Sequence, residues 1–211
     1  FGILELGMNR KGEIKKLSNI CMPDIALITK ISNAHIGNFN NLKDIALAKS
    51  EIFSGMNNSG IAILNDTDTY LSLLKESAKL SGIKQFIFFG KSKKSDISLL
   101  KVEYQKNNKF KVYVNVPGKK INFLLNNLGT HWIENSLAII SVLFAMGQDI
   151  QLFSEKIKHF QAIKGRGKLL KATFDKKKFE IIDDSYNSSP ESLSSSMSFL
   201  HRYGVTRRKI K

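Results

Sequence analysis

A lysine lies in the middle of an apolar helix face. Residues 44–53, Asp-Ile-Ala-Leu-Ala-Lys-Ser-Glu-Ile-Phe, have helical periodicity, and Ile45, Lys49 and Ile52 share one face at i, i+4 and i+7. The stem of such a lysine usually packs on the core while its ammonium reaches water. Alternatively, burial lowers the pKa of the amine, so that the neutral form can react. A neutral amine can also capture carbon dioxide as a carbamate, an anion able to bind a hard metal ion such as Mg²⁺.

Two further polar residues are predicted at strand ends. Glu5 lies near the end of the first predicted strand, and His35 follows the second. In an open parallel sheet the carboxyl ends of the strands line the ligand crevice, so both residues are candidate ligands. The commoner roles are a solvated loop residue for a single glutamate and a structural or exposed position for a single histidine.

A glycine-flanked arginine and a pair of carboxylates lie late in the chain. Arg166 stands between Gly165 and Gly167. Its guanidinium can bind a phosphate through two hydrogen bonds, although a solvated basic hinge fits the same pattern. Asp183 and Asp184 end a predicted strand in Ile-Ile-Asp-Asp-Ser-Tyr-Asn, a stretch that by itself also fits a turn entering a helix.

The phosphate-binding loop G-x-x-x-x-G-K-S/T does not occur in these 211 residues. The nearest stretch is Phe89-Gly90-Lys91-Ser92, but Gln85 stands where the first glycine is required. Backbone N–H groups wrap a phosphate only where glycines allow the loop to close around it. The stretch is therefore predicted to be a turn.

Strand-like and helix-like segments alternate in the first half of the chain. Short apolar strands are predicted at 1–6, 24–31, 60–65 and 85–89, and helices near 12–19, 42–54 and 69–80. This rhythm predicts an α/β fold with a mostly parallel sheet flanked by helices.

The second half has a different pattern. A small antiparallel meander is predicted at 97–104, 110–116 and 120–125, followed by helices at 131–146 and 151–160. A basic, glycine-rich linker at 162–168 leads to strands at 169–174 and 179–183, and Pro190 opens a helix that runs to about 203. We therefore expect one domain at 1–161 and the incomplete beginning of a second at 162–211.

Composition narrows the class of protein. The formal net charge is +15, but the lysines are scattered, which favours solvated faces over a nucleic-acid surface. Cys21 is the single cysteine, which fits a reducing, cytoplasmic compartment. The sequence contains no apolar run of about 18 residues that would predict a membrane span. Both ends of the sequence are expected to be cuts through a longer protein.

Six short motifs recur together and in order in one known family. They are Glu5-Leu-Gly-Met-Asn9 with Gly12-Glu13-Ile14, Ser32-Asn-Ala-His35, Ala46-Leu-Ala-Lys49-Ser-Glu51-Ile-Phe53, Gly129-Thr-His131 with Asn135-Ser-Leu-Ala138, Gly165-Arg-Gly-Lys168, and Asp183-Asp-Ser-Tyr-Asn187. Through them the chain resembles the Mur ligases of peptidoglycan synthesis over essentially all of its length. The last motif resembles most the members that add D-alanyl-D-alanine to UDP-N-acetylmuramoyl-tripeptide.

The resemblance implies a fold and a reaction. Residues 1–161 would be the central ATP-binding domain and 162–211 the start of a Rossmann-like C-terminal domain, without the N-terminal domain and the P-loop. In the family, ATP phosphorylates a carboxylate, and the amine of the dipeptide attacks the acyl phosphate to give an amide, ADP and phosphate. The intact enzyme is expected to be monomeric, and these residues alone to be inactive.

The resemblance also assigns roles to single residues. For Mg²⁺ it implies Glu5, His35 and a carbamylated Lys49. For the nucleotide it implies His131, Asn135, Arg166, Asp184 and Asn187. For the chemistry itself it implies Lys49, His35 and Arg166.

Two alternatives stay open. One is another ligase of the Mur or folylpolyglutamate synthase type, against which the Asp-Asp-Ser-Tyr-Asn motif argues. The other is a basic, non-catalytic nucleic-acid-binding module, which would show strongly salt-dependent binding to DNA.

Overall fold

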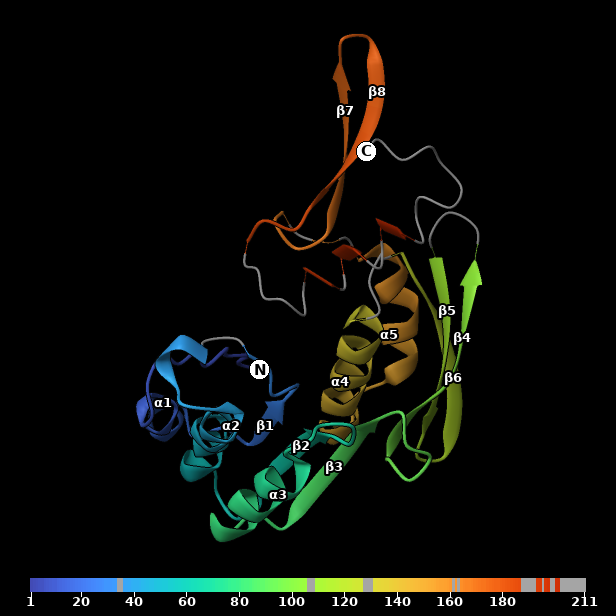
Figure 1. Ribbon diagram of the computed structural model, residues 1–211. Helices are drawn as coiled ribbons and strands as arrows, with labels where there is room; N and C mark the ends of the chain where they lie inside the picture. The colour runs from blue at the N-terminus through green and yellow to red at the C-terminus, as the bar shows by residue number, and fades with distance from the viewer. Residues whose placement is uncertain are drawn as a thin grey trace. The chain divides into compact units, whose positions relative to one another are not determined.

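The computed structural model describes residues 1–33, 36–105, 109–126, 131–160, 162, 164–186, 193–194, 196–197 and 200–201. Two compact units make up the chain. The first contains residues 1–100, 114–120 and 135–150, and the second contains the described residues of 101–113, 121–134 and 151–211. Figure 1 labels the elements along the chain.

Six strands form one sheet in sequential order: β1 (Ile25–Ile28), β2 (Ile61–Asn65), β3 (Gln85–Gly90), β4 (Ile97–Gln105), β5 (Lys109–Val116) and β6 (Lys119–Leu125). β1 pairs with β2 and β2 with β3, both in parallel. The carboxyl ends of these three strands therefore share one edge, as the alternation of strands and helices predicts.

The beginning of β4 differs from the prediction. It was expected to belong to an antiparallel meander, but Ile97 and Ser98 pair in parallel with Phe89 and Gly90 of β3. Asp96 helps to hold this junction, because its carboxylate accepts the backbone N–H of Phe88 at 2.8 Å. The meander is retained further along, since only two residues separate β5 from β6 and neighbouring strands so joined run antiparallel.

The strand predicted at 1–6 is wrong. These residues have no regular secondary structure, and the side chains of Phe1, Ile3 and Leu4 are exposed. An apolar run becomes a strand only where a neighbouring strand takes up its backbone hydrogen bonds. Within the described sheet β1 pairs only with β2, and residues 1–6 pair with no described strand.

Helices pack with the parallel strands in the core of the first unit. They are α1 (Glu13–Cys21), α2 (Leu42–Ser50) and α3 (Leu71–Leu80), with the 3₁₀ turns η1 (Ile36–Asn38) and η2 (Glu51–Gly55). Asn41 caps α2 by accepting the N–H of Asp44 at 2.9 Å. Ile45 and Leu74 are fully buried in this core with strand residues such as Leu64.

The predicted helix at 42–54 changes character at its end. Residue 51 begins the 3₁₀ turn η2, so Ile52 follows Lys49 after a change of helical pitch. Ile45 is completely buried, whereas Lys49 and Ile52 are half-buried. The lysine therefore lies at the margin of the apolar core.

The remaining helices are α4 (His131–Ala145) and α5 (Ile150–Lys156), followed by the 3₁₀ turn η4 (Ile157–His159). The two strands predicted after the linker are present as β7 (Lys168–Phe174) and β8 (Lys177–Asp183), and they pair with each other as a separate antiparallel hairpin. Its two turn residues, Asp175 and Lys176, both have positive φ, 47° and 60°, which matches the twist of a two-residue hairpin. Pro190 lies outside the described residues, but Leu193, Ser194, Ser196, Met197, Leu200 and His201 are helical.

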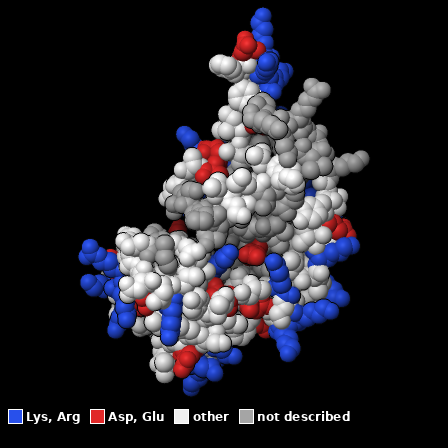
Figure 2. All heavy atoms as spheres, viewed as in Figure 1, with Lys and Arg blue, Asp and Glu red and all other residues white. Residues whose placement is uncertain are grey.

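The basic side chains are spread over the surface rather than gathered. On the face in Figure 2, the described Lys and Arg side chains project from several regions, with Asp and Glu between them. This distribution agrees with solvated faces. Among the described residues, no helix is both long and apolar enough to cross a membrane.

Candidate functional site

Lys49 points to the carboxyl edge of the parallel sheet. Its amine donates a hydrogen bond of 3.1 Å to the backbone carbonyl of Lys30, which lies just beyond β1. Burial lowers the pKa of Lys49, and the nearby Asp68 acts in the opposite direction. The lysine side chain is thus engaged with the backbone at the sheet edge instead of simply reaching water, and its burial favours loss of the proton.

Side chains at the end of β2 and just after it make hydrogen bonds to the backbone of the segment after β1. Asn65 is buried and donates through its amide to the carbonyl of Thr29 at 3.2 Å. Asp68 accepts the N–H of Ile31 at 2.7 Å through Oδ2 and the N–H of Tyr70 at 2.8 Å through Oδ1. These bonds fix the backbone around Lys30, whose carbonyl accepts the hydrogen bond from Lys49 at the sheet edge.

The other two predicted metal ligands are Glu5 and His35. Glu5 is exposed, and its carboxylate makes no hydrogen bond or ion pair among the described residues. His35 lies outside the described residues. The described part of the chain contains no cluster of three His, Cys, Asp or Glu side chains arranged to hold a metal ion. Mg²⁺ takes oxygen ligands, which a carbamate on Lys49 would offer and the amine does not.

The predicted nucleotide residues begin at α4. His131 is its first residue, and its ring lies 5.4 Å from that of Trp132, which in turn lies 4.9 Å from that of Phe160. Burial lowers the pKa of His131, whereas the charges of Asp184 and Glu134 act against this shift. The His131 ring can stack on a planar base or make a hydrogen bond through a ring nitrogen. Asn135 lies on the exposed surface one turn further along α4.

The glycine-arginine-glycine motif and the aspartate motif fold against each other. Asp183 accepts the N–H of Gly165 at 3.0 Å through its side chain and that of Gly167 at 2.8 Å through its carbonyl. Tyr186 donates its N–H to the carbonyl of Gly165 at 3.0 Å. Hydrogen bonds from Ser185, followed by that from Gly165, lower the pKa of Asp183. Two motifs that were separate in the sequence thus form one local structure.

This structure presents Arg166 and Asp184. The guanidinium of Arg166 lies 4.5 Å above the Tyr186 ring, a cation–π contact that leaves the arginine exposed. Asp184 is half-buried and accepts a hydrogen bond from the hydroxyl of Ser196. Asn187, the last predicted nucleotide contact, lies outside the described residues.

The stretch Phe89-Gly90-Lys91-Ser92 is only partly the predicted turn: Phe89 and Gly90 end β3, and the turn that follows has the Ser95 N–H bound to the Ser92 carbonyl at 3.2 Å. The backbone beyond Gly90 already binds a carboxylate. The carboxylate of Asp66 accepts the N–H of Lys91 at 3.2 Å and that of Ser92 at 2.8 Å, and also the hydroxyl of Ser95. These are the backbone donors that a phosphate would need. Asp66 therefore takes the place that a phosphate would occupy.

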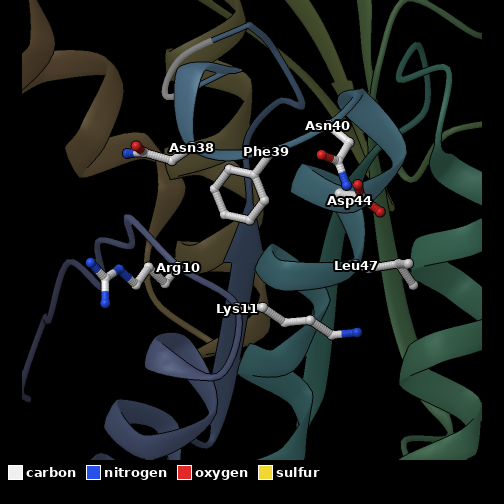
Figure 3. A pocket seen from close by; sticks show the side chains of 7 residues that line it. All are labelled: Arg10, Lys11, Asn38, Phe39, Asn40, Asp44 and Leu47. Atoms are coloured by element: carbon white, nitrogen blue, oxygen red, sulfur yellow. The ribbon is translucent and has the colours of Figure 1, made fainter.

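A cavity of about 340 Å³ opens beside the start of α2. Its lining contains two cations, two amides, a carboxylate, an aromatic ring and a leucine: Arg10, Lys11, Asn38, Asn40, Asp44, Phe39 and Leu47. In Figure 3 the Phe39 ring lies in the middle, with Asn38 and Arg10 on one side and Asn40 and Asp44 on the other. This lining suits a small polar ligand that carries an anionic group.

Sequence reasoning missed the acidic and amide residues that organise the strand ends. Asn65 is the last residue of β2, Asp66 and Asp68 follow it within three positions, and each makes side-chain hydrogen bonds to the backbone of another segment. The available signal was their position directly after a buried strand, where carboxylates and amides gather at the ligand edge.

The chain is similar to known proteins over most of its length. The Mur ligase middle domain family matches residues 1–143. The UDP-N-acetylmuramoyl-tripeptide--D-alanyl-D-alanine ligase of Rickettsia prowazekii is 30% identical over 209 residues, which cover 95% of this chain and 43% of that protein. The chain thus spans less than half the length of this relative.

Solved structures show the same similarity. MurF from Acinetobacter baumannii superposes with a TM-score of 0.83 and 28% identity, covering 94% of this chain and 42% of that one. The Thermotoga maritima MurF ligase, solved in complex with ADP, has the same fold at a TM-score of 0.75, with 24% identity over 92% of this chain and 43% of that one. The chain belongs to the Mur ligase family, whose middle domain it contains.

Proposed function

We propose that this chain is part of an ATP-dependent amide ligase of peptidoglycan precursor synthesis that joins D-alanyl-D-alanine to UDP-N-acetylmuramoyl-tripeptide. The carrying observation is that the resemblance to ligases of this name extends past the middle domain and includes the hairpin with its two motifs, since it covers about 95% of the chain. The domain boundary is proposed at 161/162. The single cysteine, Cys21, fits a cytoplasmic enzyme.

The reaction has an electrostatic problem, because an ATP phosphate must approach a substrate carboxylate. Transfer of the phosphoryl group to the carboxylate releases ADP and gives an acyl phosphate. The amine of the dipeptide attacks its carbonyl carbon, and the amide forms as phosphate leaves and the amine loses a proton. Cationic groups and metal ions placed where charge develops lower this barrier. Mg²⁺, when bound, supplies that neutralisation, and its proposed ligands are Glu5, His35 and Lys49 as a carbamate.

Lys49 supports this proposal through its environment. Conversion to a carbamate needs a neutral amine, and burial lowers the pKa of this one. The carbamate nitrogen keeps one N–H, which can still donate to the Lys30 carbonyl that the amine now contacts. The product is an anion held at the carboxyl edge of the parallel sheet, where ligands bind in folds of this type.

The nucleotide is proposed to contact the start of α4 and the motif loop of the hairpin. His131 and Asn135 would lie against the base, and Asp184 and Asn187 on the ribose side. Arg166 would reach the phosphates, and its exposed guanidinium on the Tyr186 ring is free to make two parallel hydrogen bonds to them. Closure of a lid or domain over a bound nucleotide is the common way to bring such residues into place.

The test is a ligase assay on the complete protein that contains this chain, following phosphate release with ATP, Mg²⁺, UDP-N-acetylmuramoyl-tripeptide and D-alanyl-D-alanine. Lys49→Ala is expected to reduce the rate close to background, and formate or acetate to restore part of it by replacing the carbamate. Lys49→Arg keeps a positive charge that cannot be carbamylated, so it should also be inactive. Full activity of Lys49→Arg would rule out the carbamate role.

A further inference from the structure

One peptide group lies between two side chains of opposite charge. The N–H of Ile31 and the C=O of Lys30 belong to the same peptide unit. Asp68 accepts that N–H at 2.7 Å, and Lys49 donates to that C=O at 3.1 Å. The carboxylate of Asp68 and the amine of Lys49 are thus connected through a single planar group.

This arrangement is rigid on the acidic side. Asp68 is half-buried, and both of its oxygens accept backbone N–H groups, from Ile31 and Tyr70. Its own backbone is fixed as well, because its N–H donates to the Asn65 carbonyl at 3.3 Å. A carboxylate with both oxygens engaged has little freedom to rotate, so the peptide unit beyond it is held in one orientation.

A simpler role for Asp68 is to open α3. Its side chain accepts the N–H of Tyr70 and its carbonyl that of Leu71, which is the usual behaviour of an aspartate at a helix start. That role explains the hydrogen bond that Oδ1 accepts from Tyr70 but not the one that Oδ2 accepts from Ile31. Oδ2 accepts a hydrogen bond from a residue 37 positions away in the sequence. That residue, Ile31, shares its peptide group with the Lys30 carbonyl to which Lys49 donates.

We propose that Asp68 is a positioning residue for Lys49, acting through the Lys30–Ile31 peptide group. By fixing the direction of the Lys30 carbonyl, Asp68 holds the lysine nitrogen at the sheet edge, where the proposed reaction needs its carbamate. The inference rests on the proposed role of Lys49. The arrangement itself involves neither ATP nor a metal ion and can be tested without them.

The experiment is NMR spectroscopy of this chain, labelled with ¹³C and ¹⁵N, without nucleotide or Mg²⁺. The native chain should show a nuclear Overhauser contact between the ε-methylene of Lys49 and the α-proton of Lys30. It should also show a slowly exchanging Ile31 amide proton, shifted downfield by its bond to a carboxylate. In Asp68→Ala the Lys49 contact should be lost and the Ile31 proton should move upfield. Asp68→Asn keeps one uncharged acceptor, so it should weaken the contact and move the proton upfield by less.

Asp66→Asn is the matched control. Asp66 also follows β2 and also accepts two backbone N–H groups, but these belong to Lys91 and Ser92. The Asp66→Asn substitution should therefore disturb the turn after β3 and leave the Lys49 contact intact. Asp68→Asn can still accept one N–H through its remaining oxygen, so it provides a folded variant if Asp68→Ala does not fold.

A substitution of Lys49 itself separates the positioning role of Asp68 from its role at the start of α3. Lys49→Met removes the donor to the Lys30 carbonyl without touching the Ile31 N–H, so the Ile31 proton should move upfield while the Tyr70 amide stays unchanged. The inference would be overturned if the nuclear Overhauser contact of Lys49 persisted unchanged in both Asp68 variants. It would also be overturned if Lys49→Met left the chemical shift of the Ile31 amide proton unchanged. A failed ligase assay would leave these results standing and would count only against the proposed function.

Discussion

Gly165 and Asp183 are 18 positions apart, and the Asp183 carboxylate accepts the Gly165 N–H at 3.0 Å. The bond joins the glycine-arginine-glycine loop to the end of β8. It explains why both motifs occur together in one chain, because each supplies the hydrogen-bonding partners of the other. Arg166 is presented from a loop built by both.

Gly165→Ala should loosen this loop more than Gly167→Ala does. Both glycines have a positive φ, 80° and 81°, which costs an alanine about 1–2 kcal/mol. At Gly165 an added Cβ would also lie 2.9 Å from the Cβ of Tyr186, whereas at Gly167 it would meet nothing within 4 Å. Hydrogen exchange of the Tyr186 amide measures the difference. Equal loss of protection in the two variants would contradict the contact argument.

The loop should also open in acid. The pKa of Asp183 is lowered, first by the Ser185 hydroxyl and also by the Gly165 N–H, so the folded loop binds the carboxylate form preferentially. Its stabilising effect is complete above the ordinary value of 3.8 and is lost as the pH falls through the lowered pKa. Protection of the Gly165 amide should fall in that range, and Asp183→Asn should make it independent of pH there.

Glu51 should contribute to stability through α1. Its carboxylate accepts the N–H of Gly12 at 2.8 Å and that of Lys15 at 3.2 Å, donors that the first turn of a helix cannot satisfy internally. Glu51→Gln should lower the free energy of unfolding by about 1–2 kcal/mol, measured by urea denaturation. Glu76→Gln, an exposed position on α3, should change it by less than about 0.5 kcal/mol.

Sequence patterns predicted most elements because local periodicity and strand-end chemistry were both visible. The position of Lys49 on α2 and the two strands β7 and β8 follow from these patterns, whereas the pairing of the strands as a hairpin does not. The strand at 1–6 was wrong because its formation depends on a pairing partner rather than on its own apolar residues. The role of Asp68 was missed because it depends on which backbone group lies opposite, which no sequence spacing reveals.

Burial of Lys49 should be visible in the alkaline stability of the chain. Between its lowered pKa and the ordinary value of 10.5, the folded chain has released a proton that the unfolded chain still binds. The free energy of unfolding should therefore rise with pH in this window, because the unfolded state binds more protons. Lys49→Met should remove that component, measured by urea denaturation at several pH values. Lys43→Met, on the exposed side of α2, should retain it.

The chain by itself should have no ligase activity. A γ-phosphate needs a cradle of backbone N–H groups and a lysine, and these 211 residues contain no G-x-x-x-x-G-K-S/T sequence. The nearest substitute cannot serve, because Asp66 already binds the N–H groups of Lys91 and Ser92 and would repel a phosphate. Incubation with ATP, Mg²⁺ and both substrates should release phosphate only at background rate, whereas the complete protein should turn over. Release by the chain that survives repurification would show that it binds the γ-phosphate through groups other than a P-loop.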